Sequence, residues 1–169
     1  AGLTAIAALV LSLSPFYSKE REDSIVEKVG LTRGICVVLG DRNCETAVQL
    51  ARHTDLLIYV QLESAEEVEA ARRVADGEGL YGNRIWVDRG EFSRVQLGDN
   101  LADVLVAPSG AATKISKAEA LRVVCPRGKA LLGRQTLVKP VLQKVDDWSH
   151  PYHGPDNNPQ SEDQVARAP

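Results

Sequence analysis

The sequence lacks several features that would assign it to a membrane, nucleic-acid or redox class. No run of 18 apolar residues is present, so we predict no clear membrane span. Neither charge dominates, with 20 basic against 23 acidic residues, so overall charge does not indicate nucleic acid as a partner. The cysteines, at 36, 44 and 125, have neither CxxC nor zinc-ribbon spacing. We interpret Cys36 and Cys125 as small apolar residues of strands and place Cys44 in a loop.

What is present fits a folded protein of one domain with additional segments. The 169 residues are 44% hydrophobic and 25% charged, which excludes a chain that is disordered throughout. We predict an apolar segment over residues 1–18, a domain over residues 19–140, and an extended tail over residues 141–169. The tail is rich in proline and aspartate and has little apolar periodicity.

The first segment allows two interpretations. The eleven residues from Leu3 to Leu13 carry no charge and resemble the apolar centre of a secretory signal, although the basic start is missing. A signal remnant would place the protein in the periplasm or outside the cell. The alternative is a short hydrophobic helix that packs on the domain or on a partner, in which case we expect a cytoplasmic protein.

Between residues 19 and 140, strand and helix patterns alternate. Continuous apolar runs predict strands over 34–39 and 56–62, and shorter runs predict strands over 84–87, 104–107 and 129–133. Helical spacing predicts helices over 19–29, 45–53, 65–76 and 116–123, with Ser64 and Glu67 as a capping box. This order predicts an α/β fold with a doubly wound, mostly parallel sheet, and a ligand crevice at the carboxyl ends of its strands.

Two common nucleotide motifs are absent from this crevice. At the turn after the first predicted strand, neither GxGxxG nor GxxxxGK[ST] is present, which argues against a nicotinamide dehydrogenase and a P-loop enzyme. The turn after the first strand offers one glycine, Gly40, followed by Asp41. Glu63 follows the second strand, where an acid can hold ribose hydroxyls, and Gln61 is a second candidate for a hydroxyl contact.

A family resemblance rests on several segments in a fixed order. These are Gly40 with Leu50-Ala51-Arg52, Glu69–Arg72 with Gly79-Leu80, Arg84–Val87 with Gly90-Glu91, Asp99-Asn100 with Asp103–Val106, and Leu121–Lys129. Together, residues 34–133 resemble a class I S-adenosylmethionine-dependent methyltransferase domain. The resemblance implies a Rossmann-like fold and S-adenosylmethionine as the cofactor.

The resemblance also implies the cofactor-binding residues. The sequence departs most from the family pattern at these positions. It assigns Asp41, beside Gly40, to the ligand ammonium, Glu63 to the ribose and Glu91 to the adenine amino group. Arg42 and Cys44 replace two glycines of the usual turn, and a Cβ at either position can block close approach to the methionine part of the ligand. No acceptor motif follows the fourth strand and no general base stands out, so the catalytic residues stay unassigned.

The tail has the most unusual composition of any segment of the chain. His150 and His153 lie among aspartates, but closely spaced prolines make an extended segment, so we predict a docking segment and no metal site. Asp147–His150 with Asn157–Ser161 resembles the opening strand of propeller domains of the pyrroloquinoline-quinone type. The whole arrangement resembles large propeller proteins of planctomycete-type bacteria, which implies that the chain is a fragment whose propeller would follow.

Two functions remain open from the sequence. The first is a degenerate methyltransferase-like domain without catalysis, which docks on its own propeller or on another subunit through residues 145–169. The alternative is an active S-adenosylmethionine-dependent methyltransferase with an unknown acceptor. The replaced glycines favour the first.

Overall fold

The protein has a sheet of six strands between helices. The computed structural model describes residues 25–145, 155, 156 and 164. The strands are β1 (Arg33–Leu39), β2 (Asp55–Leu62), β3 (Ile85–Arg89), β4 (Ala102–Ala107), β5 (Val124–Leu132) and β6 (Gln135–Val138). The helices are α2 (Glu45–His53), α3 (Ala65–Gly77), α4 (Ser109–Ala112) and α5 (Lys117–Val123), and residues 25–29 are also helical.

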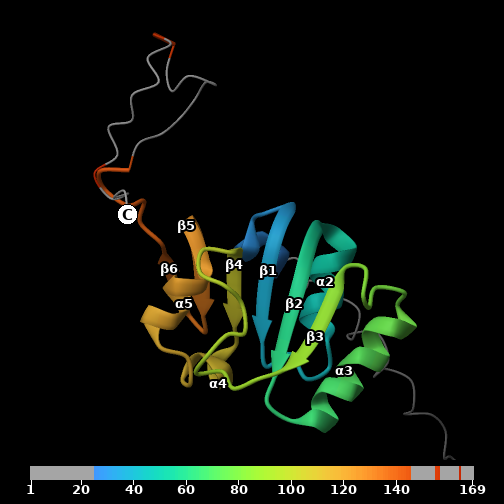
Figure 1. The fold of residues 1–169 in the computed structure, drawn as a ribbon. Coiled ribbons are helices and arrows are strands. Elements are labelled where there is room, and N and C mark those ends of the chain that lie inside the picture. Colours follow the sequence, from blue (N-terminus) through green and yellow to red (C-terminus); the bar gives the residue numbers. More distant parts are fainter. Residues whose placement is uncertain (1–24, 146–154, 157–163, 165–169) are drawn as a thin grey trace, which may run out of the picture.

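The sheet has the order β3-β2-β1-β4-β5-β6 (Figure 1). All neighbours are parallel except β5 and β6, which form an antiparallel hairpin. The central strand β1 pairs Val38 with Val60 of β2 and with Val106 of β4. The chain order reverses beside β1, so the carboxyl ends of β1, β2 and β4 surround the crevice expected of such a sheet. The predicted doubly wound, mostly parallel fold is confirmed.

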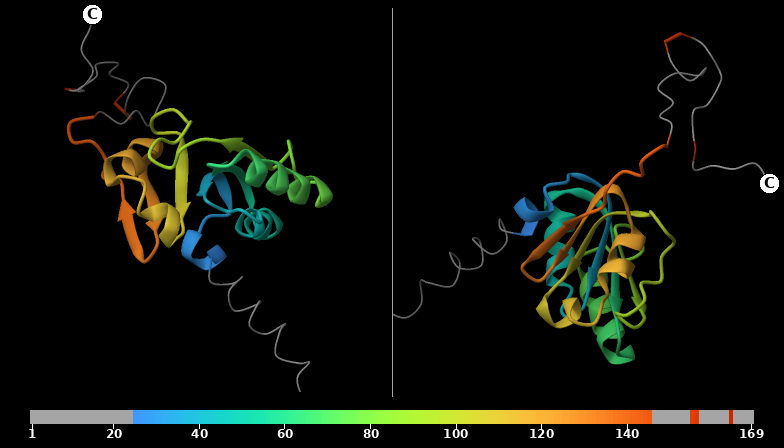
Figure 2. Two further views of the ribbon diagram at one scale, coloured as in Figure 1. Left: turned by 90° about the horizontal axis from the view of Figure 1, so that it is seen from below. Right: turned by 90° about the vertical axis from the view of Figure 1, so that its left-hand side faces the viewer.

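Each face of the sheet has its own core (Figures 1 and 2). Helices α2 and α3, with Val29, bury one face through residues such as Leu50 and Ala71. The other face is covered by α5, by α4 and by the connection between β3 and β4, residues 90–101, which contributes Phe92 and Val95. That connection contains no helix, so its backbone depends on side chains from elsewhere for hydrogen bonds.

Several details differ from the sequence-based expectations. The strand predicted over 129–133 begins five residues earlier, at Val124, and continues through a turn into β6, which the sequence did not indicate. Helix α4 was also not indicated. Ser64 caps α3 as expected, but its hydroxyl accepts from the amide of Glu66. Glu67, the expected second half of the cap, instead pairs with Arg42.

Some predictions fall outside the described residues. These are the apolar segment over 1–18, the start of the helix over 19–29, and most of the tail, including both of its histidines. Within the described part of the chain, no helix is long and apolar enough to cross a membrane.

Candidate functional site

The turn after β1 is built around Gly40 and Asp41. Gly40 has a φ of +73°, which favours glycine, and its amide donates to the carbonyl of Gln61 on β2. The Asp41 side chain turns inward and accepts from the amides of Ala47, at 2.9 Å, and Thr46, at 3.4 Å. It therefore satisfies amides at the start of α2. Burial raises the pKa of Asp41, and these two amides oppose the rise.

The space above Gly40 is filled by the protein itself. A Cβ placed on Gly40 would lie 3.3 Å from the Cβ of Ala111 and 3.4 Å from the Cζ of Phe92. Phe92 comes from the β3–β4 connection and Ala111 from α4, and both are buried. A ligand that approached the backbone of Gly40 would have to displace an aromatic ring from the core. The residues at this end of the crevice therefore do not fit the methionine part of S-adenosylmethionine.

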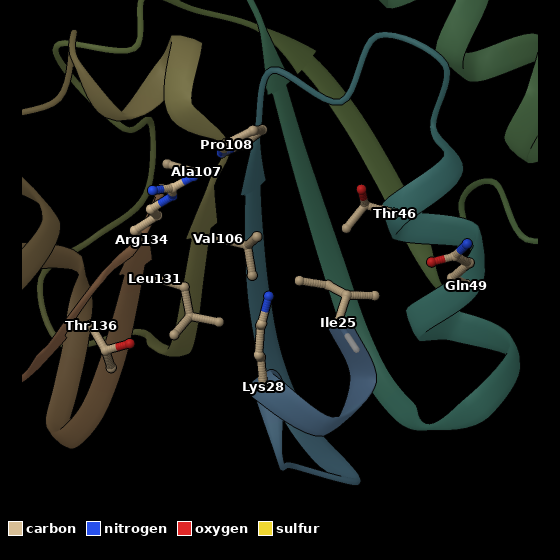
Figure 3. Close-up of a pocket in the computed structure, with 11 residues that line it drawn as sticks. Ile25, Lys28, Thr46, Gln49, Val106, Ala107, Pro108, Leu131, Arg134 and Thr136 are labelled. Carbon is tan, nitrogen blue, oxygen red and sulfur yellow. The ribbon is translucent and has the colours of Figure 1, made fainter. Parts of the chain in front are cut away.

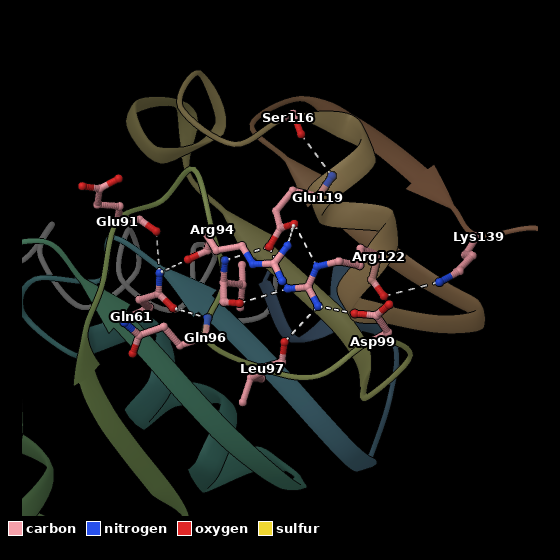
Figure 4. Close-up of polar contacts among 11 residues, drawn as sticks. Gln61, Glu91, Arg94, Gln96, Leu97, Asp99, Ser116, Glu119, Arg122 and Lys139 are labelled. Atoms are coloured by element: carbon pink, nitrogen blue, oxygen red, sulfur yellow. Dashed lines mark hydrogen bonds and ion pairs between the residues drawn. The ribbon is translucent and has the colours of Figure 1, made fainter.

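Gln61, near the end of β2, holds this connection in place (Figure 4). Its side chain is fully buried, and its amide nitrogen donates to the carbonyls of Glu91, at 2.7 Å, and Arg94, at 2.9 Å. Its amide oxygen accepts from the backbone of Gln96 at 3.0 Å. The residue that the sequence offered for a ligand hydroxyl thus binds the chain's own backbone.

Helix α5 holds the other end of the connection (Figure 4). The Glu119 carboxylate accepts from the backbone amide of Val95 at 2.9 Å and from the guanidinium of Arg122 at 2.7 Å. Arg122 also donates to the carbonyls of Val95 and Leu97, each at 3.0 Å. Hydrogen bonding from Arg122 lowers the pKa of Glu119, so the network is held by a carboxylate in its charged form.

Glu63 and Glu91 remain accessible and line the same open depression. It has a volume of about 810 Å³ and is also lined by Arg89, Gly90, Ser93, Gln96 and Lys114. Glu63 forms an ion pair with Lys114 at 2.5 Å, and this contact lowers the pKa of Glu63. Lys114 also lies 5.4 Å from the centre of the Phe92 ring. Opposite charges of the chain itself therefore meet at Glu63, the residue that the family resemblance assigns to the ribose.

The two side chains that replace glycines lie away from the space above Gly40. The Arg42 side chain is 74% exposed and pairs with Glu67 on α3 at 2.8 Å. Cys44 is buried where α2 begins, with a φ of +56°, and burial raises the pKa of its thiol to about 12. The side chains nearest to a Cβ on Gly40 are those of Ala111 and Phe92, and a block by Arg42 or Cys44 stays a prediction.

The predicted site residues thus divide into two groups. Glu63 and Glu91 share the depression, whereas Gly40 and Asp41 do not line it. Sequence reasoning missed Phe92, Ala111 and Lys114, which come from segments that approach β1 and β2 only in the folded chain. Among the described residues, no group of three histidine, cysteine or acidic side chains is arranged to hold a metal ion.

Comparison with known proteins shows the fold. No protein-family model matches the sequence, and no curated protein matches it. Solved structures do match, at low sequence identity. One is a protein of Methanococcus maripaludis assigned as an S-adenosylmethionine-dependent methyltransferase. It has 23% identity and a TM-score of 0.58, and the match covers 65% of this chain and 52% of that one.

Two other matches differ from each other in chemistry. A [4+2]-cyclase has a TM-score of 0.60 and 23% identity, over 67% of this chain and 43% of its own. A geranyl diphosphate methyltransferase solved with S-adenosylmethionine has a TM-score of 0.57 and 10% identity, and the match covers 66% of this chain and 46% of that one. The chain thus spans about half the length of these structures. Its described domain has the Rossmann-like fold of class I S-adenosylmethionine-dependent methyltransferases.

Proposed function

We propose that this chain is a non-catalytic, methyltransferase-like docking module whose cofactor crevice is filled by its own side chains. The observation that carries the proposal is the contact of Phe92 and Ala111 with Gly40, where a methyltransferase of this fold needs open space. Hydrogen bonds to Gln61 and Glu119 fix the connection that carries Phe92. The fold does not require methyl transfer, since a cyclase shares it.

We also propose that residues 145–169 join this module to a propeller domain, in the same chain or in another subunit. The support is the composition of that tail and its resemblance to a propeller's opening strand. Sequencing the gene beyond the codon for Pro169 tests the first arrangement. Several four-stranded blades encoded in frame would support it. A stop codon would leave only the arrangement with a second subunit.

The alternative, an active methyltransferase, is favoured by one observation. The depression beside Glu63 and Glu91 remains open at the place where ribose and adenine would bind. A ligand held only there would leave its methyl group without contacts at Gly40. The two proposals therefore differ in whether the cofactor binds at all.

Calorimetric titration with S-adenosylmethionine and S-adenosylhomocysteine separates them. The docking proposal expects no binding at millimolar ligand. Micromolar binding that Glu63→Ala weakens at least tenfold would overturn it and support the enzyme. Glu27→Ala is the matched control, because Glu27 is exposed and lies outside the depression. Binding that neither variant changes would place the ligand outside the depression and would also contradict the docking proposal, which expects no binding.

A further inference from the structure

A second cavity lies on the sheet face that carries α2 (Figure 3). It has a volume of about 510 Å³ and lies between residues 25–29 and α2 on one side and the β5–β6 hairpin on the other. Figure 3 shows Val106 and Leu131 on the sheet, with Ile25 beside them. All three belong to, or pack against, the core of this face. The cavity is therefore a gap in the helical layer above β4 and β5.

The face of the hairpin that continues from this cavity carries the apolar Leu131 and Val138 together with Thr136 and Lys129. Thr136 of β6 is paired with Leu131, and Val138 with Lys129, so these four side chains point to the same face. Thr136 is exposed, and Val138 is 61% exposed. An edge strand with this exposure is normally covered.

The cavity is also positively charged. Lys28 and Arg134 line it, and no acidic residue does. Lys129 lies beside it on the same face, 3.5 Å from the position of a Cβ on Gly30. None of the three cations forms an ion pair with a residue in the described ranges. An occupant should therefore combine an apolar surface with acidic residues.

The chain immediately before the cavity has this composition. Ile25 lines the cavity, and residues 19–24 before it have a net negative charge, with Glu20, Glu22 and Asp23 against Lys19 and Arg21. Further back, Leu3, Ile6, Val10 and Leu13 recur at helical spacing within an uncharged run. An eleven-residue helix is about 16 Å long, the length of about five strand residues. The residues between Leu13 and Ile25 can span about 36 Å when extended, which is ample to reach the hairpin.

We propose that residues 3–13 of this chain dock along the cavity and the exposed face of the β5–β6 hairpin. Their apolar stripe packs on Val106, Leu131 and Val138, and the acidic residues before Ile25 lie opposite Lys28 and Arg134. The segment then completes the helical layer on this face. This inference does not depend on the proposed function, because the cavity and the filled crevice are lined by different residues.

A double-mutant cycle in the full-length chain tests the docking. Val10→Asp puts a charge on the apolar stripe, and Ser12→Asp, on the opposite side of the same helical turn, is its control. Thr136→Arg puts bulk and charge on the hairpin, and Gln135→Arg, its exposed neighbour on the other face, is the second control.

The readouts are the thermal midpoint and amide hydrogen exchange of the hairpin. We expect Val10→Asp to lower the midpoint by about 5 °C and to raise exchange in β6 about tenfold, with little effect of Ser12→Asp. We expect Thr136→Arg to lower the midpoint in the otherwise native chain and to have no further effect beside Val10→Asp.

Three results would overturn the proposal. One is equal behaviour of Val10→Asp and Ser12→Asp, as expected of a signal remnant that contacts nothing in the domain. Another is a Thr136→Arg effect that is unchanged beside Val10→Asp. A change in oligomeric state with Val10→Asp, without the coupling to Thr136, would assign the segment to a partner and would also count against docking on this chain.

Discussion

Removal of the Gln61 side chain should measure how firmly the β3–β4 connection is held. Gln61→Ala removes three hydrogen bonds from a fully buried position, two to carbonyls and one from an amide. At about 1 kcal/mol for each bond, we expect a loss of about 3 kcal/mol in the free energy of unfolding. That loss is a large part of the total free energy of unfolding of an ordinary domain, roughly 5–15 kcal/mol. It corresponds to a thermal midpoint lower by about 10 °C.

Urea unfolding followed by circular dichroism would test this expectation, with Gln143→Ala as an exposed control. Gln61→Glu sharpens the test because it keeps the shape but turns a carboxylate toward two carbonyl oxygens. Burial, with the amide of Gln96 as a donor to only one of its two oxygens, should raise the pKa of this new carboxyl above its unfolded value. The variant should therefore be weakest near pH 8 and should regain stability as the pH falls through the raised pKa. A loss below about 0.5 kcal/mol for Gln61→Ala, typical of a surface substitution, would refute the reasoning.

Three further predictions concern charge and burial. Glu119→Gln should lower the free energy of unfolding by about 2 kcal/mol at pH 7. Arg122 lowers the pKa of Glu119 in the folded state, so the contribution of Glu119 to stability is present above its unfolded pKa and is lost as the pH falls through its folded pKa. The urea midpoints of the variant and the native chain should therefore converge in acid. A difference between the midpoints that stays constant with pH would contradict this. The Cys44 thiol should not react with a disulfide reagent at pH 8 until urea unfolds the chain. If Cys44 in the folded chain reacted as fast as an exposed thiol, its burial would be contradicted. Arg42→Ala should change the free energy of unfolding by less than about 1 kcal/mol in the same urea assay, because Arg42 is 74% exposed in its pair with Glu67, and a larger loss would show a role that this geometry does not explain.

The site was predictable where it depends on strand ends. Runs of apolar residues locate the ends of β1 and β2 within one residue, and this places Gly40 and Glu63 at the crevice. The connection over 90–101 was not predictable in the same way. Its two apolar anchors, Phe92 and Val95, have no helical or strand period. Its partners come from distant positions, since Gln61 lies 30 residues before Glu91 and Glu119 lies 24 residues after Val95.

The sequence by itself therefore determined the layer order of this protein, because hydrophobic periodicity and chain order restrict a β-α-β chain to very few sheets. The tertiary structure alone decided which side chains contact Gly40. Close packing between segments that are distant in the sequence places Phe92 there, and no local pattern encodes that packing.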